Sequence, residues 1–451
     1  MRSCVALLAL ALATHATAGE PDALAAKAGE FRAQIQARHL APEGVLLYRV
    51  DLDTIASDIA TGAYPEHADG PTFTGLFAGA ACARAEATDA AASVEARADA
   101  ALALAGLELQ MRVTGVQGLL ARNVRRAPPR AGVSGEWHAG QGEYAGWYWR
   151  GDVSQDQYAN GLVPAVGLCR RLFPERARRL AVDAASHLLA NDFELTDPDG
   201  ERTRFGDLSW RSGLGFNSIA QLTSYAIVSL AAELAPDQKR FRDTRDRLRD
   251  HYRVVARAGL TNLRVLGITN HSNDLMAFDL YRVLLPLARE TGDPAEADLR
   301  YGLWRAWLRV RQDRNAYFDL VFCSLEPGAC DAGLLARARD QLARFPLEKR
   351  SLGSNHAALG IPTRLLPGRK WKRLAREIVP IELRPASSFE WKSSPYRIYA
   401  HANPNSEYTG LDYLVAYWLY ASVCSTRDDC RPSDSSESAH APIEGLGAIP
   451  W

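Results

Sequence analysis

The stretch SQDQYANGLVPAVGLCRRLF at residues 154–173, followed by RARRLAVDAASHLLAN at 176–191, contains the pattern that decides the fold. The first segment is apolar all round and rich in small residues, which predicts a helix buried on every side. The second segment has apolar residues at helical spacing and a charged opposite face, which predicts an outer helix. Together they indicate a hairpin of one inner and one outer helix.

The same two kinds of helix alternate along most of the chain. Inner helices are predicted at 71–86, 154–173, 215–234, 272–290 and 406–423. Outer helices are predicted at 91–114, 175–191, 237–258, 294–313 and 333–345. The segment 355–366 fits the remaining inner position less well, because Pro362 interrupts it. The best strand candidate, LLYRVDL at 46–52, is isolated, so the pattern predicts stacked helical hairpins.

Several inner helices follow polar, aromatic openings, such as WYWRGDVSQDQY at 147–158 and NPNSEYTGLDYL at 403–414. With these openings and the alternation of helices, residues 60–425 resemble the (α/α)6 toroid, or six-hairpin glycosidase-like, superfamily. The resemblance implies an all-α fold, an (α/α)6 toroid of alternating inner and outer helices, over a domain at 19–425. That superfamily includes glycoside hydrolases, polysaccharide lyases and non-enzymatic members, so the fold alone does not choose a function.

Composition narrows the class of protein. The 451 residues are 47% hydrophobic, enough for a large core, and 53 basic residues balance 53 acidic ones. A balanced charge argues against a nucleic-acid partner. Nucleophile elbows, P-loops, Rossmann fingerprints and HExxH are absent, which argues against esterases, kinases, dehydrogenases and metalloproteases. No zinc-ligand spacing surrounds the cysteines, and DPDGE at 197–201 lacks downstream calcium ligands, so we predict neither a metal nor a cofactor.

The N-terminal segment and the cysteines indicate export. Residues 1–18 resemble a signal peptide, and the apolar run within them is too short to span a bilayer. We therefore expect an exported protein, periplasmic or secreted, without a transmembrane segment, and a polar, flexible tail at 426–451. Cys323/Cys330 and Cys424/Cys430 are close pairs that could form disulfide bonds in an oxidising compartment. Cys82 and Cys169 lie in apolar helical stretches, as buried thiols or a third bridge.

In a toroid the N-termini of the inner helices meet at one rim, where their unsatisfied N–H groups and dipoles favour anionic groups such as uronate carboxylates. Ser154 and Gln157 form an S-x-x-Q capping box, which places Asp156 in the first helical turn and Asp152 ahead of it. Asp69 precedes Pro71 at another inner helix and is more simply a cap or turn residue than a ligand-binding one.

A glycoside hydrolase acting on a polysaccharide or oligosaccharide is the favoured function. It needs two carboxyl groups flanking the glycosidic bond, and our candidates are Asp152 or Asp156 on one side and Glu407 on the other. Side chains that could bind the carbohydrate at this position are the flat rings and one cation: Trp147, Trp149, Arg150 and Trp391.

A polysaccharide lyase that cleaves a uronic-acid glycan by β-elimination is the first alternative. It needs a group that neutralises the carboxylate (Asn270, Asn355 or Arg150), a base (His271 or His356) and an acid such as Tyr408. Asn273 and Asp274 belong to the same polar opening at 270–274 and are further binding candidates. A toroid that binds a glycan without turnover is the second alternative.

Overall fold

The computed structural model describes residues 23–215, 217–260, 270–353, 359–366, 372–427 and 430. The predicted signal peptide at 1–18 and nearly all of the predicted tail at 426–451 lie outside these residues and stay predictions. Within the described part the chain is mostly helical, as expected, and the strands are short. No helix there combines the length and the apolar character needed to cross a bilayer.

The buried helices follow the predicted inner series closely. They are α3 (Gly70–Ala87), α5 (Val163–Cys169), α7 (Ser218–Leu234), α9 (His271–Thr291), α11 (Ala316–Leu325) and α13 (Leu411–Cys424). A π-helical segment, η3 (Gln157–Leu162), continues directly into α5. Most side chains of these helices belong to one hydrophobic core, which explains why their sequences are apolar on all sides.

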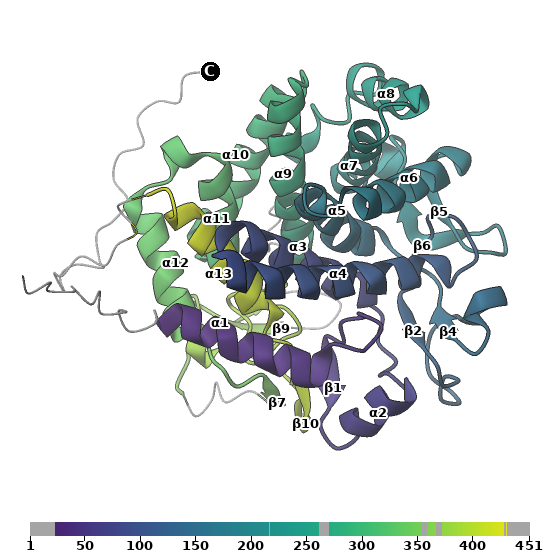
Figure 1. The fold of residues 1–451 in the computed structure, drawn as a ribbon. Coiled ribbons are helices and arrows are strands. Elements are labelled where there is room, and N and C mark those ends of the chain that lie inside the picture. The colour runs from purple at the N-terminus through teal and green to yellow at the C-terminus, as the bar shows by residue number, and fades with distance from the viewer. Residues whose placement is uncertain are drawn as a thin grey trace, which may run out of the picture.

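The amphipathic helices are α1 (Ala23–Gln34), α4 (Ala90–Arg112), α6 (Pro174–Ala190), α8 (Lys239–Asp246), α10 (Glu296–Val310) and α12 (Ala332–Arg344). Each from α4 to α12 packs against the buried helix that precedes it in the chain, and α1 packs against α13. The buried helices also contact one another in chain order, and the last of them, α13, contacts α3. Figure 1 shows this meeting of the two ends, with the yellow α13 beside the dark blue α3.

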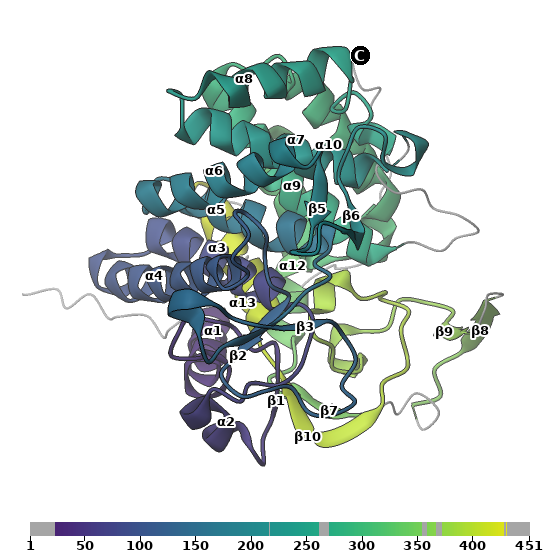
Figure 2. The same ribbon diagram turned by 90° about the vertical axis from the view of Figure 1, so that its right-hand side faces the viewer.

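The remaining helix, α2 (Ile55–Thr61), and four small sheets complete the described part. One sheet contains β1 (Arg49–Asp51), β10 (Ala402–Tyr408) and β7 (Arg350–Leu352) in that order, and another contains β2 (Asn123–Arg125), β4 (Tyr148–Arg150) and β3 (Trp137–Ala139). Two hairpins are formed by β5 (Glu194–Thr196) with β6 (Arg202–Asp207), and by β8 (Thr363–Leu366) with β9 (Lys372–Ala375). In Figure 2 the β8–β9 hairpin extends from the body at the right.

Three sequence predictions are wrong in position. The sixth buried helix is α11, whereas the described end of 355–366 forms strand β8. The helix expected from Ser406 begins at Leu411, because Ser406 belongs to β10. The strand at 46–52 exists as β1 but is not isolated, since it pairs antiparallel with β10.

The cysteine pairs form three disulfide bonds. Cys323–Cys330 and Cys424–Cys430 are joined as the spacing predicted, and Cys82–Cys169 is a bridge rather than two thiols. The Cys82–Cys169 bond connects α3 to α5, the two helices on which the polar cluster described below is built.

Candidate functional site

Two buried helices approach each other unusually closely at the start of the polar cluster. A Cβ atom on Gly75 of α3 would overlap the carbonyl group of Gly161 in η3, and one on Gly161 would overlap the carbonyl group of Pro71. Glycine at both positions therefore lets the two backbones touch. The consequence is that the residues just before α3 and just before η3 lie side by side.

These neighbouring helix starts bring two carboxyl groups together. Asp69 directly precedes α3, but its side chain does not cap that helix. Instead Gln157 Nε2 donates a hydrogen bond to Asp69 Oδ1 at 3.2 Å. Asp156 accepts a hydrogen bond from the Ser154 hydroxyl. The predicted capping box is formed in one direction, since the Ser154 amide donates to Gln157 Oε1 at 2.8 Å.

The environments of the two carboxyl groups differ. Burial raises the pKa of Asp156, and the negative charge of Asp69 raises it further, against the opposing effects of Ser154, Arg122 and Lys392. Asp69 lies closer to the cations, with Arg122 Nη2 at 3.5 Å and Lys392 Nζ at 4.0 Å from its carboxylate oxygens. Its side chain is 26% exposed, so solvent reaches it. Asp156 thus holds a proton more readily than an aspartate in water does.

Arg122 positions this pair from the loop between α4 and β2. It donates from Nε to the Ala68 carbonyl at 2.9 Å and from Nη1 to the Asp152 carbonyl at 3.0 Å. Asp152 has a left-handed backbone with φ of 55°, and its Oδ1 accepts from the Arg204 amide at 2.8 Å. Its carboxylate therefore binds the β5–β6 hairpin, and its second oxygen lies 4.0 Å from Arg122 Nη1.

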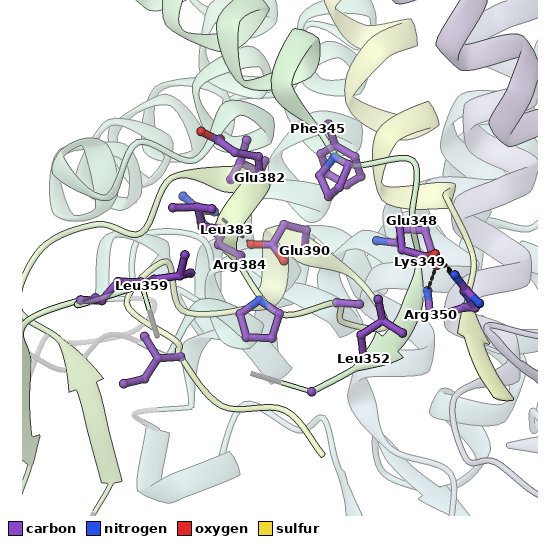
Figure 3. A pocket seen from close by; sticks show the side chains of 17 residues that line it. Phe345, Glu348, Lys349, Arg350, Leu352, Leu359, Glu382, Leu383, Arg384 and Glu390 are labelled. Atoms are coloured by element: carbon purple, nitrogen blue, oxygen red, sulfur yellow. Dashed lines mark hydrogen bonds and ion pairs between the residues drawn. The ribbon is translucent and has the colours of Figure 1, made fainter. Parts of the chain in front are cut away.

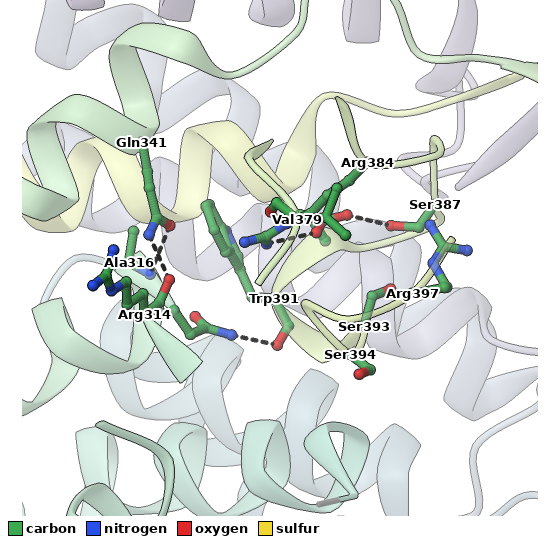
Figure 4. Close-up of polar contacts among 12 residues, drawn as sticks. Arg314, Ala316, Gln341, Val379, Arg384, Ser387, Trp391, Ser393, Ser394 and Arg397 are labelled. Carbon is green, nitrogen blue, oxygen red and sulfur yellow. Dashed lines mark hydrogen bonds and ion pairs between the residues drawn. The ribbon is translucent and has the colours of Figure 1, made fainter. Parts of the chain in front are cut away.

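Lys392 reaches the cluster from η10 (Glu390–Lys392), which polar contacts fix in place. The Glu390 amide donates to Asp412 Oδ2 at 2.9 Å, and Arg384 Nη1 donates to Glu390 Oε1 at 3.0 Å. The Ser387 hydroxyl donates to the same glutamate, and Asn315 Nδ2 donates to the Trp391 carbonyl oxygen at 2.9 Å. Figure 4 labels Arg384, Ser387 and Trp391 in this region. The Lys392 ammonium group lies 5.3 Å from the centre of the Phe73 ring. Its position beside Asp69 is therefore set by the fold.

Tyr48 and His67 lie on the side of the cluster that packs against the apolar ring of Phe73. The Tyr48 ring stacks on Phe73 with centroids 4.5 Å apart and lies 4.4 Å from the His67 ring. Burial and the charge of Asp69 raise the pKa of Tyr48 to about 12. Burial and the positive charges of Arg49 and Arg150 lower the pKa of His67 to about 3. Both side chains are therefore neutral at physiological pH.

The tryptophans do not offer the exposed faces that the sequence suggested. Trp147, Trp149 and Trp391 are 6%, 2% and 0% exposed. The Trp147 ring is covered by the Arg126 guanidinium at 4.2 Å, and Trp149 stacks on His138 at 4.2 Å. Because protein covers these rings, they pack the interior, and Trp147 and Trp149 lie next to and within β4, whose last residue is Arg150.

Glu407 was expected opposite Asp156 but is engaged elsewhere. Arg38 donates two hydrogen bonds to its carboxylate, at 2.8 and 3.0 Å, and His39 Nε2 lies 3.1 Å away. Burial alone would raise the pKa of Glu407, but hydrogen bonds from His39 and Arg38 outweigh it and lower the pKa to about 2. The residue therefore attaches β10 to the N-terminal segment. Tyr408 pairs with Arg49 on β1 and interacts electrostatically with Tyr48.

The polar opening of α9 forms a separate group. Asn270 caps the helix by accepting a hydrogen bond from the Asn273 amide at 3.3 Å. His271 Nε2 lies 3.1 Å from Asp313 Oδ2, and Asp274 forms an ion pair with Arg309. These contacts give Asn270, His271 and Asp274 a role in stabilising the fold. Asn355 and His356 lie outside the described residues.

A cavity of about 310 Å³ lies between the start of β7 and the 381–398 segment (Figure 3). Its charged residues pair with one another or with the core: Arg384 with Glu390, Arg350 with Glu348, and Lys349 with Asp412. Because these charges are already paired, the cavity has less to offer a charged ligand than the cluster around Asp69. Across the described residues, no group of three or more His, Cys, Asp or Glu side chains could hold a metal ion.

The polar cluster therefore combines Asp69, Asp156, Arg122, Arg150, Lys392, Tyr48 and His67. Only Asp156 and Arg150 were among the sequence candidates, and Asp69 had been assigned to capping. The only signal for Asp69 was its position at an inner helix start. The comparisons with known proteins add no further candidate: no protein-family model matches the chain, and no curated protein or solved structure matches it.

Proposed function

We propose that the chain is an (α/α)6 toroid that hydrolyses a glycosidic bond at the Asp69–Asp156 pair. The toroid is supported by the regular pairing of one buried with one amphipathic helix and by the contact between α13 and α3. In a toroid these polar residues would belong to the rim formed by the inner helix starts. Export to the periplasm or to the outside of the cell is supported by the three disulfide bonds.

The main support for a hydrolase is that two neighbouring carboxyl groups lie in different electrostatic environments. Asp156 is the general acid, because burial and Asp69 favour its protonated form. Asp69, beside two cations, is the general base. In the reaction, Asp156 gives its proton to the leaving oxygen as the glycosidic C–O bond breaks. A water molecule forms the new bond to the anomeric carbon and gives its proton to Asp69, so inversion at that carbon is expected.

A polysaccharide lyase remains the second candidate because of His67. Neither of its ring nitrogens has a hydrogen-bond partner within the described residues, so one of them is free to accept a proton from a sugar carbon. Arg150 beside it could neutralise the uronate carboxylate during β-elimination. The expected bases His271 and His356 support the lyase less well, since His271 is buried against Asp313 and His356 lies outside the described residues.

A panel of polysaccharides and oligosaccharides tests the proposal, with new reducing ends and the ultraviolet absorbance of unsaturated uronates measured in parallel. The wild-type protein should release reducing ends without an absorbance gain, and Asp156→Asn should reduce the release by about a thousandfold. Asp243→Asn, an exposed aspartate on α8, is the matched control and should keep full activity. A gain in absorbance would replace the hydrolase with the lyase. Glycan binding without either signal would reject both and leave the non-catalytic toroid.

A further inference from the structure

Among the described residues, Arg150 is the cation of the cluster whose guanidinium group forms no hydrogen bond or ion pair. Within the described residues Asp69 is bound by Arg122 and Lys392, and Asp152 lies within 4.0 Å of Arg122 and Arg204. No hydrogen bond or ion pair there engages the Arg150 guanidinium group, which is half-buried. Burial and the positive charge of Arg122 lower the pKa of Arg150, against the opposing effects of Asp69, Tyr48 and Asp152, none of which forms an ion pair with it.

The guanidinium group is also held in place. A Cβ atom on Gly135 would overlap it, so the loop before β3 packs directly against Arg150. Its backbone is fixed on both sides, since β4 pairs with β2 through Asn123 and with β3 through Trp137. A fixed guanidinium group offers two parallel N–H donors, the geometry that matches a planar carboxylate.

His67 supplies the second, independent observation. Its side chain is 3% exposed, and both ring nitrogens lack a hydrogen-bond partner within the described residues. Buried polar groups in native proteins are nearly always paired, so an unpaired ring indicates a missing ligand or water molecule. His67, Tyr48 and Arg150 are mutual neighbours, as their electrostatic interactions and the 4.4 Å ring contact show.

From these contacts we propose that Arg150, with His67 and Tyr48, binds the carboxylate of a uronic acid residue in the substrate. Arg150 forms the bidentate ion pair, while the neutral ring of His67 and the hydroxyl of Tyr48 each donate one hydrogen bond. One guanidinium group without an ion-pair partner among the described residues can pair with one negative charge, which fits a carboxylate. The inference rests on the proposed function, because it places an acidic sugar beside the carboxyl pair Asp69 and Asp156.

Calorimetric titration with free glucuronate and galacturonate, against glucose and galactose, tests the subsite without any turnover. The wild-type protein should bind a uronate at least about tenfold more tightly than its neutral counterpart, since charge-assisted pairs are worth that much. Arg150→Gln should remove the preference. Arg150→Lys should retain part of it, because lysine keeps the positive charge but lacks the two parallel N–H donors of the guanidinium group. Arg204→Gln, an exposed arginine of the neighbouring hairpin, is the matched control and should keep it.

Equal binding of uronate and neutral sugar by the wild-type protein would overturn the subsite, and this outcome needs no variant to fold. Tighter binding of sugar sulfates than of uronates would overturn the assignment to a carboxylate. The two proposals fail separately. Asp156-dependent hydrolysis of a neutral glycan without uronate preference would remove the subsite alone. Arg150-dependent uronate binding in a protein that cleaves no glycan would remove the hydrolase alone.

Discussion

Asp156 and Glu407 are two acidic residues with similar neighbours in the sequence, but the fold surrounds them with different groups, which shift their pKa values in opposite directions. Both follow a serine just before an apolar run. Asp156 lies in the opening of η3, next to a second carboxyl group, and its pKa is raised. Glu407 lies in strand β10, bound by Arg38 and His39, and its pKa is lowered to about 2. One environment favours a proton and the other favours the charge.

The difference shows how partners rather than burial decide what a carboxyl group can do. Burial opposes ionisation of both residues, but Glu407 receives two hydrogen bonds from a guanidinium group and is stabilised as an anion. The cations near Asp156 are shared with Asp69 and compensate it only in part. Glu407 therefore contributes to stability, and Asp156 is left for chemistry. Four experiments should separate these roles.

The largest effect is expected from the carboxyl pair itself. Asp156→Asn and Asp69→Asn should each reduce glycan hydrolysis by about a thousandfold, the range for losing a general acid or base. Chemical denaturation of the same variants should show little loss of stability, because the cations near Asp69 lie 3.5 and 4.0 Å away, whereas Arg38 donates two hydrogen bonds to Glu407. If Asp156→Asn hydrolysed the glycan at the wild-type rate, Asp156 would have only a structural role, as Glu407 has. An unchanged rate for Asp69→Asn would exclude Asp69 as the general base.

The next effect concerns the approach of the two helices. Gly161→Ala should force η3 away from Pro71 and move Asp156 relative to Asp69. A displacement of about 1 Å can cost about a hundredfold in rate, so kcat should fall by that order. Gly29→Ala in α1, where a Cβ atom would meet nothing within 4 Å, is the matched control. Equal kcat values for the two variants would show that the close contact does not position the pair.

Removal of Glu407 should change stability. Glu407→Ala leaves Arg38 and His39 without their carboxylate, and should lower the free energy of unfolding by about 2 kcal/mol, as for a broken buried pair with one partner partly exposed. Glu348→Ala, which removes the exposed partner of Arg350, should cost less than about 1 kcal/mol. Urea denaturation measures both. A cost for Glu407→Ala no larger than for Glu348→Ala would contradict the structural role.

The smallest effect is a dependence of stability on pH. Because the pKa of Glu407 is about 2 in the folded protein and 4.5 ordinarily, its contribution is complete above pH 4.5 and is lost as the pH falls toward 2. Asp156 has the opposite sign, since a raised pKa makes its contribution decrease as the pH rises through the ordinary value of 3.8. Denaturation curves for wild type and Glu407→Gln should therefore converge on acidification. Parallel curves would contradict this assignment.

The helices could be predicted well because their signal is local. The bounds of α3, α4, α6 and α9 agree within two residues with the apolar spacing, as does the alternation of buried and amphipathic helices. The helix α11 was missed because its apolar run, AYFDLVFCSL, is only ten residues long, and a short apolar run does not distinguish a buried helix from a buried strand. The segment 355–366 was placed in its position instead.

The site could be predicted only in part, because its residues are assembled by long-range contacts. Asp69 looks like a helix cap, yet its carboxylate turns to Gln157 of another helix. Arg122 and Lys392 come from connecting segments without a local pattern. Glu407 was misplaced because a serine and a glutamate before an apolar run indicate a helix start, whereas pairing of β10 with β1 and β7 extends the strand instead.

The most direct test of the account is a ¹³C NMR titration of the side-chain carboxyl groups, with Asp156→Asn and Glu407→Gln used to assign the two signals. The account predicts that the Asp156 carboxyl titrates above its ordinary 3.8 and the Glu407 carboxyl near 2. Titration of Asp156 at or below 3.8 would contradict its role as the proton donor, whatever the position of Glu407.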